Sequence, residues 1–157
     1  MQLLFICTGN TCRSPLAEVI ARHVLAARGV EDVHVGSAGT NAWDGASASD
    51  GSLLVAMEHG LDLSGHRARA ITRDLVDSAD LLLTMSTSHL ERVEALGGAD
   101  KSHLLTAFAA GGSGRDGGRP VHDPFGSDLV VYRETYDELY EEITRVVDRL
   151  VDARRPR

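Results

Sequence analysis

Short apolar runs alternate along the chain with longer stretches in which apolar residues recur every three or four positions. The short runs predict buried β-strands, and the longer stretches predict amphipathic helices. The expected strands are Gln2–Cys7, Asp32–Ala38, Leu81–Met85 and Ser102–Leu105, and the expected helices are Ser14–Arg28, Ala48–Glu58, Ser86–Leu96 and Asp128–Ala153. Strands that alternate with helices indicate an α/β fold with a parallel sheet. In such folds a ligand binds at the carboxyl ends of the strands.

The most informative segment lies between the first strand and the first helix. It reads Cys7-Thr8-Gly9-Asn10-Thr11-Cys12-Arg13-Ser14-Pro15. A loop that leads into a helix directs backbone N–H groups and the positive end of the helix dipole at one place, which favours an anion. A cysteine in that field is expected to react as a thiolate, and Arg13 can offer two N–H groups to one phosphoryl group. The spacing therefore predicts that residues 8–13 bind phosphate around the Cys7 sulfur, with Ser14 placed to hydrogen-bond that sulfur.

Asn10 has two possible uses in this loop. It can adopt a left-handed backbone conformation, or it can hold the loop in shape through its side-chain amide.

Length and composition restrict the class of protein. A chain of 157 residues is long enough for one domain, which we take to span residues 1–157. The net charge of −7 argues against a nucleic-acid partner. We see neither a signal peptide nor an apolar run of membrane length, so we expect no membrane partner. Two cysteines in one loop favour a reducing, cytoplasmic location, and histidines without metal-ligand spacing favour no metal and no other cofactor.

A candidate general acid lies ahead of the last expected helix, in Val121-His122-Asp123-Pro124-Phe125-Gly126. Thiolate attack on a phosphorylated side chain produces a leaving group that needs a proton, and the resulting thiophosphate needs an activated water. One carboxyl group can act as acid in the first step and as base in the second. Asp123 is the candidate, although an Asp-Pro pair by itself is more typical of a turn.

These segments together resemble the low-molecular-weight protein-tyrosine-phosphatase family. The resemblance covers nearly the whole chain, through Cys7–Pro15, Ser37–Gly39, His59–Leu61, His66–Arg69, Asp80–Met85 and Asp123–Phe125. It implies a three-layer sandwich around a four-stranded parallel sheet, and a protein phosphatase that forms a cysteinyl phosphate. It implies phosphorylated proteins as substrates, and inorganic phosphate or other oxyanions as product or inhibitor. It also assigns the general acid to Asp123, and a loop-supporting hydrogen-bond network to Asn10, Ser14 and His66.

Two positions differ from the tyrosine-directed members of this family. Those members carry a branched apolar residue where this chain has Thr11, and two aromatic residues where it has Phe125 and Gly126. The more polar pattern resembles the protein-arginine-phosphatase branch, because Thr11 and Asp123 can accept hydrogen bonds from a phosphoguanidinium. Trp43 lies near the position of a substrate wall and favours phosphotyrosine instead. We expect a wall of Thr11, Trp43 and Phe125 that prefers phosphoarginine, with phosphotyrosine as the alternative.

Other interpretations of the sequence are weaker. A cysteine phosphocarrier would not need both Arg13 and Asp123, and an arsenate reductase would need more redox cysteines than Cys7 and Cys12. Cys12 itself is either a redox partner that forms a disulfide with Cys7 or a buried thiol that packs. The glycine-rich segment 109–119 has few apolar groups, which predicts a mobile loop that is either a lid or a plain surface connection.

Overall fold

The computed structural model describes residues 1–155, and within that range one parallel sheet forms the centre of the molecule. Its four strands lie in the order β2-β1-β3-β4. They are β1 (Gln2–Cys7), β2 (His34–Gly39), β3 (Leu81–Thr84) and β4 (Ser102–Leu104). Cys7 pairs with Gly39, so the two strands end at the same level. The expected parallel sheet is confirmed, and its carboxyl edge carries the end of β1 that leads into the candidate loop.

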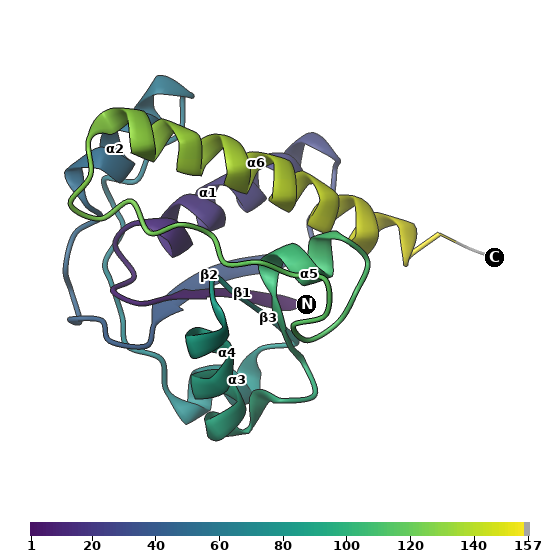
Figure 1. Ribbon diagram of the computed structural model, residues 1–157. Coiled ribbons are helices and arrows are strands. Elements are labelled where there is room, and N and C mark those ends of the chain that lie inside the picture. Colours follow the sequence, from purple (N-terminus) through teal and green to yellow (C-terminus); the bar gives the residue numbers. More distant parts are fainter. Residues whose placement is uncertain (156–157) are drawn as a thin grey trace.

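Helices cover both faces of the sheet (Figure 1). On one face lie α1 (Arg13–Ala27), α5 (Leu105–Ala109) and α6 (Leu129–Asp152), and α2 (Asp50–Glu58) packs against α1 and α6. On the other face lie α3 (Arg73–Ser78), α4 (Thr87–Val93) and a distorted π-type turn, η1 (Glu94–Gly98). The expected three-layer α/β sandwich is therefore confirmed. No helix within residues 1–155 is both long and apolar enough to cross a membrane.

The central strand β1 contributes to both layers of core. Leu3 and Phe5 pack in the cluster that contains α1 and α6, whereas Leu4 and Ile6 pack in the cluster that contains α3. This alternation follows from the two-residue period of a strand. The buried residues of α6 recur at helical spacing and are Tyr132, Thr135, Tyr136, Leu139, Glu142, Ile143, Val146, Val147 and Leu150. Each large apolar side chain buried in this way stabilises the fold by about 1.5–3 kcal/mol.

Two short helices were not expected from the sequence. The helix α3 has six residues, too few to show a helical period, although Thr72 caps it by accepting a hydrogen bond from Leu75 N at 3.1 Å. The helix α5 begins directly after β4, in a segment that carried no helix signal. The helix expected over Ser86–Leu96 is α-helical only to Val93 and continues as the π-type turn η1, in which Gly97 with φ of +96° breaks the helical backbone.

The glycine-rich segment 109–119 is fastened to its neighbours by hydrogen bonds. Leu104 N donates to Gly114 O, and Gly114 N donates to His103 Nδ1, each at 2.8 Å. Arg149 Nη1 donates to Gly112 O, also at 2.8 Å. Main-chain hydrogen bonds thus support a segment that has few apolar side chains, and its mobility stays a prediction.

Candidate active site

The loop between β1 and α1 is held in shape by Asn10. This residue has φ of +55° and is fully buried. Its Nδ2 donates to Ser14 Oγ at 2.8 Å and to Ser37 Oγ at 2.9 Å, and its Oδ1 accepts from Arg69 N at 3.0 Å. Both uses considered for Asn10 thus occur together: its backbone is left-handed and its amide links α1, β2 and the segment after His66.

The sulfur of Cys7 lies at the centre of this loop. Cys7 Sγ and Ser14 Oγ are joined by a hydrogen bond of 2.8 Å, and His66 Nε2 is 2.7 Å from Asn10 O. The end of β2 approaches so closely that a Cβ on Gly39 would lie 2.3 Å from Thr8 O. Only glycine fits at that position. The structure therefore brings together the nucleophile candidate and the three residues proposed to support its loop.

Arg13 begins α1 and has a buried guanidinium beside the loop. Its Nη1 donates to Val121 O at 3.0 Å, and its Nη2 lies 3.6 Å from Asp123 Oδ2. Arg13 Nε is buried and has no hydrogen-bond partner within the described part of the chain. A buried N–H group left unpaired is costly. The site is therefore electrostatically suited to an anion that supplies the missing acceptor.

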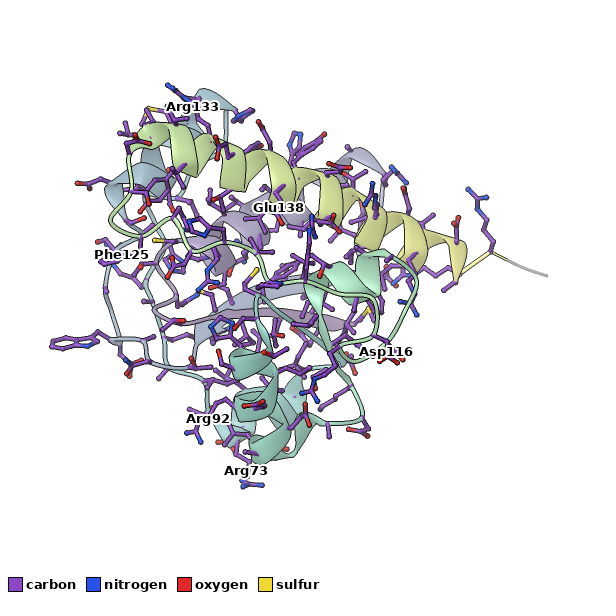
Figure 2. The ribbon with its side chains drawn as sticks, in the orientation of Figure 1. Arg73, Arg92, Asp116, Phe125, Arg133 and Glu138 are labelled. Carbon is purple, nitrogen blue, oxygen red and sulfur yellow. The ribbon has the colours of Figure 1, made fainter. Side chains whose placement is uncertain are left out.

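Asp123 lies at the mouth of the site with its side chain half exposed. Phe125 N donates to Asp123 Oδ1 at 3.1 Å, and Ser127 N donates to Pro124 O at 2.9 Å. Gly126 completes this turn with φ of +79°, a conformation that favours glycine. The turn leads into α6, and Phe125 lies on it at the edge of the molecule (Figure 2).

A cleft of about 310 Å³ joins these groups. Its lining consists of Cys7, Thr8, Gly9, Thr11, Cys12, Arg13, Asn41, Trp43, Ala46, Asp123 and Phe125. The expected wall residues Thr11, Trp43 and Phe125 all line the cleft. Trp43 is 83% exposed and Phe125 is 71% exposed. Asn41 and Ala46 were missed, although their position just after the carboxyl end of β2 was a usable signal.

The comparisons with known proteins agree with this geometry. Residues 2–155 match the family model described as low molecular weight phosphotyrosine protein phosphatase. The chain belongs to this family. The phosphatase is similar to the protein-arginine-phosphatase of Bacillus subtilis strain 168, with 34% identity over 139 residues, or 87% of this chain and 88% of the relative.

Two further relatives show the range of the family. The low molecular weight protein-tyrosine-phosphatase PtpB of Staphylococcus haemolyticus is 38% identical over 138 residues, which cover 87% of this chain and 91% of that protein. The solved structure of the YwlE arginine phosphatase, a mutant with a phosphorylated active-site serine, is 32% identical with a TM-score of 0.87 and 98% coverage of each chain. This chain is therefore a low-molecular-weight protein phosphatase, and its relatives include both arginine and tyrosine phosphatases.

Cys12 of the phosphatase packs beneath the loop. Its Sγ lies 3.2 Å from Ser49 Oγ and 3.5 Å from Tyr132 Oη. Burial and the neighbouring thiol raise the pKa of Tyr132 to about 12, so its hydroxyl stays protonated. Both cysteines are free thiols in this structure. These contacts describe a packed thiol with polar neighbours, and a disulfide between Cys7 and Cys12 stays a prediction.

His89 is a site residue that the sequence reasoning missed. It lies on α4 and is buried, with Nε2 2.8 Å from Thr8 Oγ1 and Nδ1 3.1 Å from Ser86 Oγ. Burial and the positive charge of Arg13 lower the pKa of His89 to about 4, so the ring is neutral at pH 7. A lone histidine on a helix carries little signal, but its position just after the carboxyl end of β3 was a usable one.

Proposed function

We propose that this phosphatase hydrolyses phosphoarginine side chains of proteins through a cysteinyl phosphate on Cys7. The observation that carries the proposal is the composition of the cleft mouth. Thr11 lines the mouth with a hydroxyl group. Phe125 contributes one ring, and the next residue, Gly126, has no side chain and a backbone conformation that favours glycine. A hydroxyl group in the lining and the absence of a ring at Gly126 distinguish this mouth from a slot shaped for a phenyl group.

The proposed reaction begins with attack by the sulfur of Cys7 on phosphorus. The S–P bond forms as the P–N bond breaks, and the guanidine nitrogen takes the proton of the Asp123 carboxyl group. Ser14 Oγ, 2.8 Å from the sulfur, donates a hydrogen bond to the thiolate before attack. Arg13 Nε and the loop N–H groups hold the phosphoryl oxygens as charge moves onto them.

The second step regenerates the enzyme. The Asp123 carboxylate takes a proton from a water molecule whose oxygen attacks phosphorus, so an O–P bond forms as the S–P bond breaks. The products are inorganic phosphate and the Cys7 thiolate. The half-exposed position of Asp123 gives it access to that water.

Hydrogen-bond acceptors at the mouth support phosphoarginine as the preferred substrate. A phosphoguanidinium carries N–H donors, which a phenyl phosphate lacks. Thr11 Oγ1 has a weak contact with Cys12 Sγ at 3.8 Å and so retains the capacity to accept. The carbonyl oxygen of the Asp123 carboxyl group, which lines the same cleft, is a second acceptor.

Phosphotyrosine is the second candidate, and Trp43 is the observation that favours it. The indole lines the cleft and is 83% exposed, so it is free to pack against an incoming ring. Together with Phe125 it offers two aromatic faces to a phenyl group.

Steady-state kinetics decide between phosphoarginine and phosphotyrosine as the preferred substrate. The two substrates are peptides of the same sequence, one phosphorylated on its arginine and the other on its tyrosine. We expect the wild type to have the higher kcat/KM for phosphoarginine. Thr11→Ile should lower kcat/KM for phosphoarginine and raise kcat/KM for phosphotyrosine, so that the ratio of the two changes by about tenfold or more. The reason is that the variant loses a hydrogen-bond acceptor and gains an aliphatic group that packs on a phenyl ring. Thr144→Ile on α6 is the matched control and should leave the ratio unchanged. A wild type that prefers phosphotyrosine would assign the enzyme to phosphotyrosine, and a ratio that Thr11→Ile does not move would show that the Thr11 hydroxyl does not set the preference.

A further inference from the structure

A chain of hydrogen bonds runs from α4 to the guanidinium of Arg13. Arg13 Nη2 lies 3.5 Å from Thr8 Oγ1, and Thr8 Oγ1 lies 2.8 Å from His89 Nε2. His89 Nδ1 lies 3.1 Å from Ser86 Oγ, which is 2.9 Å from Ser88 Oγ at the surface. The chain connects the phosphate-binding arginine to a helix on the opposite face of the sheet.

The donors in this chain can be assigned from its arginine end. A guanidinium only donates, so Thr8 Oγ1 accepts from Arg13. The Thr8 hydroxyl proton is then available for His89 Nε2, which accepts it. A neutral ring with an acceptor at Nε2 carries its proton at Nδ1, and that N–H donates to Ser86 Oγ. Every group in the chain then has a consistent role.

We propose that His89 is a positioning residue for Arg13 and acts through the Thr8 hydroxyl. By accepting the Thr8 proton, His89 fixes the rotation of that hydroxyl and turns its lone pairs toward the guanidinium. This holds the guanidinium in the plane in which Nε faces the phosphoryl oxygens. The role deepens the proposed function, on which it rests, since it concerns the same phosphate-binding arginine.

The surroundings of His89 keep its ring in the accepting form. The charged groups that act on it are Arg13 from α1 and Asp123 from the segment before α6, with opposite effects on its charge. Burial and the arginine prevail, and the pKa of His89 falls to about 4. A protonated ring would donate at Nε2 and would displace the Thr8 proton.

A double-mutant cycle on inorganic phosphate binding tests the role. The variants are His89→Leu, which fills the space without an acceptor, Thr8→Val, which removes the hydroxyl, and the pair together. In His89→Gln, the amide oxygen replaces the Nε2 acceptor. His103→Leu is the matched control, because His103 is a half-buried histidine that accepts from Gly114 N outside the cleft. Calorimetry gives Kd for phosphate, and p-nitrophenyl phosphate gives kcat and KM.

We expect His89→Leu to weaken phosphate binding by about tenfold, the double variant to be no weaker than Thr8→Val alone, and His89→Gln to restore binding. His103→Leu should bind phosphate like the wild type. Wild-type binding in His89→Leu, losses that add in the double variant, or no rescue by His89→Gln would each overturn the role. If His89→Leu does not fold, Thr8→Val should still bind weakly while His89→Gln binds normally, and equal binding by both would overturn it.

The Kd for phosphate and the kinetic constants for p-nitrophenyl phosphate are measured without a peptide substrate, so neither depends on whether the enzyme prefers phosphoarginine or phosphotyrosine. Failure of the substrate proposal would appear in the peptide ratio of the wild type, whereas failure of the His89 role would appear in the cycle.

Discussion

Arg13 contacts both the loop between β1 and α1 and the segment that leads into α6. Its Nη1 donates to Val121 O, its Nη2 faces Thr8 and Asp123, and its buried Nε has no partner in the described chain. A planar fork is needed to reach these acceptors and a phosphoryl group at once. Arg13 thus connects the proposed phosphate-binding loop with the segment that carries Asp123.

Arg13→Lys should lower kcat/KM by about 10²-fold or more, although the charge is kept. An ammonium cannot hold Val121 O and two phosphoryl oxygens together, because its three donors diverge from one point. Kinetics with p-nitrophenyl phosphate measure the loss, and Arg22→Lys on the exposed face of α1 is the control. Near-normal activity in Arg13→Lys would show that the fork is not required.

At the scale of elements, the segment 119–125 holds Asp123, the proposed general acid, at the cleft. Thr106 Oγ1 accepts from Arg119 N at 2.7 Å and donates to Arg119 O at 2.6 Å. Val121 N donates to Met85 O at 2.8 Å. These bonds tie the segment to α5 and to the end of β3, so Asp123 reaches the mouth from a fixed support.

Asp123→Asn should slow hydrolysis of phosphoarginine and alkyl phosphates by about 10²–10⁴-fold, and cleavage of p-nitrophenyl phosphate much less. A general acid matters in proportion to the leaving group's need for a proton. Asparagine keeps an Oδ1 that accepts from Phe125 N, so the turn is preserved. Single-turnover rates across leaving groups measure the effect, and an equal loss for all of them would make Asp123 structural.

Helices and strands could be predicted where the sequence shows a hydrophobic period or a recognisable loop motif. The strand Gln2–Cys7 and the helix that Asp128 caps follow from runs long enough to show their period. The helices α3 and α5 are too short to show a helical period. The segment 109–119 is supported by Arg149 and His103, and no local sequence pattern connects these residues to it.

At the scale of the whole molecule, the site joins segments that the sequence keeps far apart. Cys7, Arg13 and Asp123 were predictable because each lies in a recognisable motif. For His89 the sequence offered only its position after the carboxyl end of β3, and for Tyr132 it offered no signal, because their contacts with Thr8 and Cys12 exist only after α4 and α6 pack on the sheet. Local signatures thus point to the groups proposed to react, while tertiary packing determines which side chains contact them.

Folding stability should fall in acid because of His89. Its pKa is about 4 in the folded protein and 6.5 ordinarily, so the unfolded chain binds a proton that the folded one excludes. Above pH 6.5, His89 leaves the free energy of unfolding independent of pH. As the pH falls from 6.5 toward about 4, the free energy of unfolding falls by up to about 1.4 kcal/mol per pH unit. Urea unfolding of the wild type and of His89→Gln over this range measures it. The wild type should lose more stability than the variant, and parallel profiles would contradict the neutral ring.

Trapping the phosphorylated enzyme tests the central claim most directly, namely that Cys7 carries the phosphoryl group. Asp123→Asn, mixed with p-nitrophenyl phosphate and rapidly quenched, should accumulate one phosphate per chain, located on Cys7 by mass spectrometry, because attack continues while hydrolysis is slowed. Cys7→Ser should not turn over p-nitrophenyl phosphate while still binding inorganic phosphate through the loop and Arg13. Appreciable turnover by Cys7→Ser, or a trapped phosphate on any other residue, would contradict the mechanism.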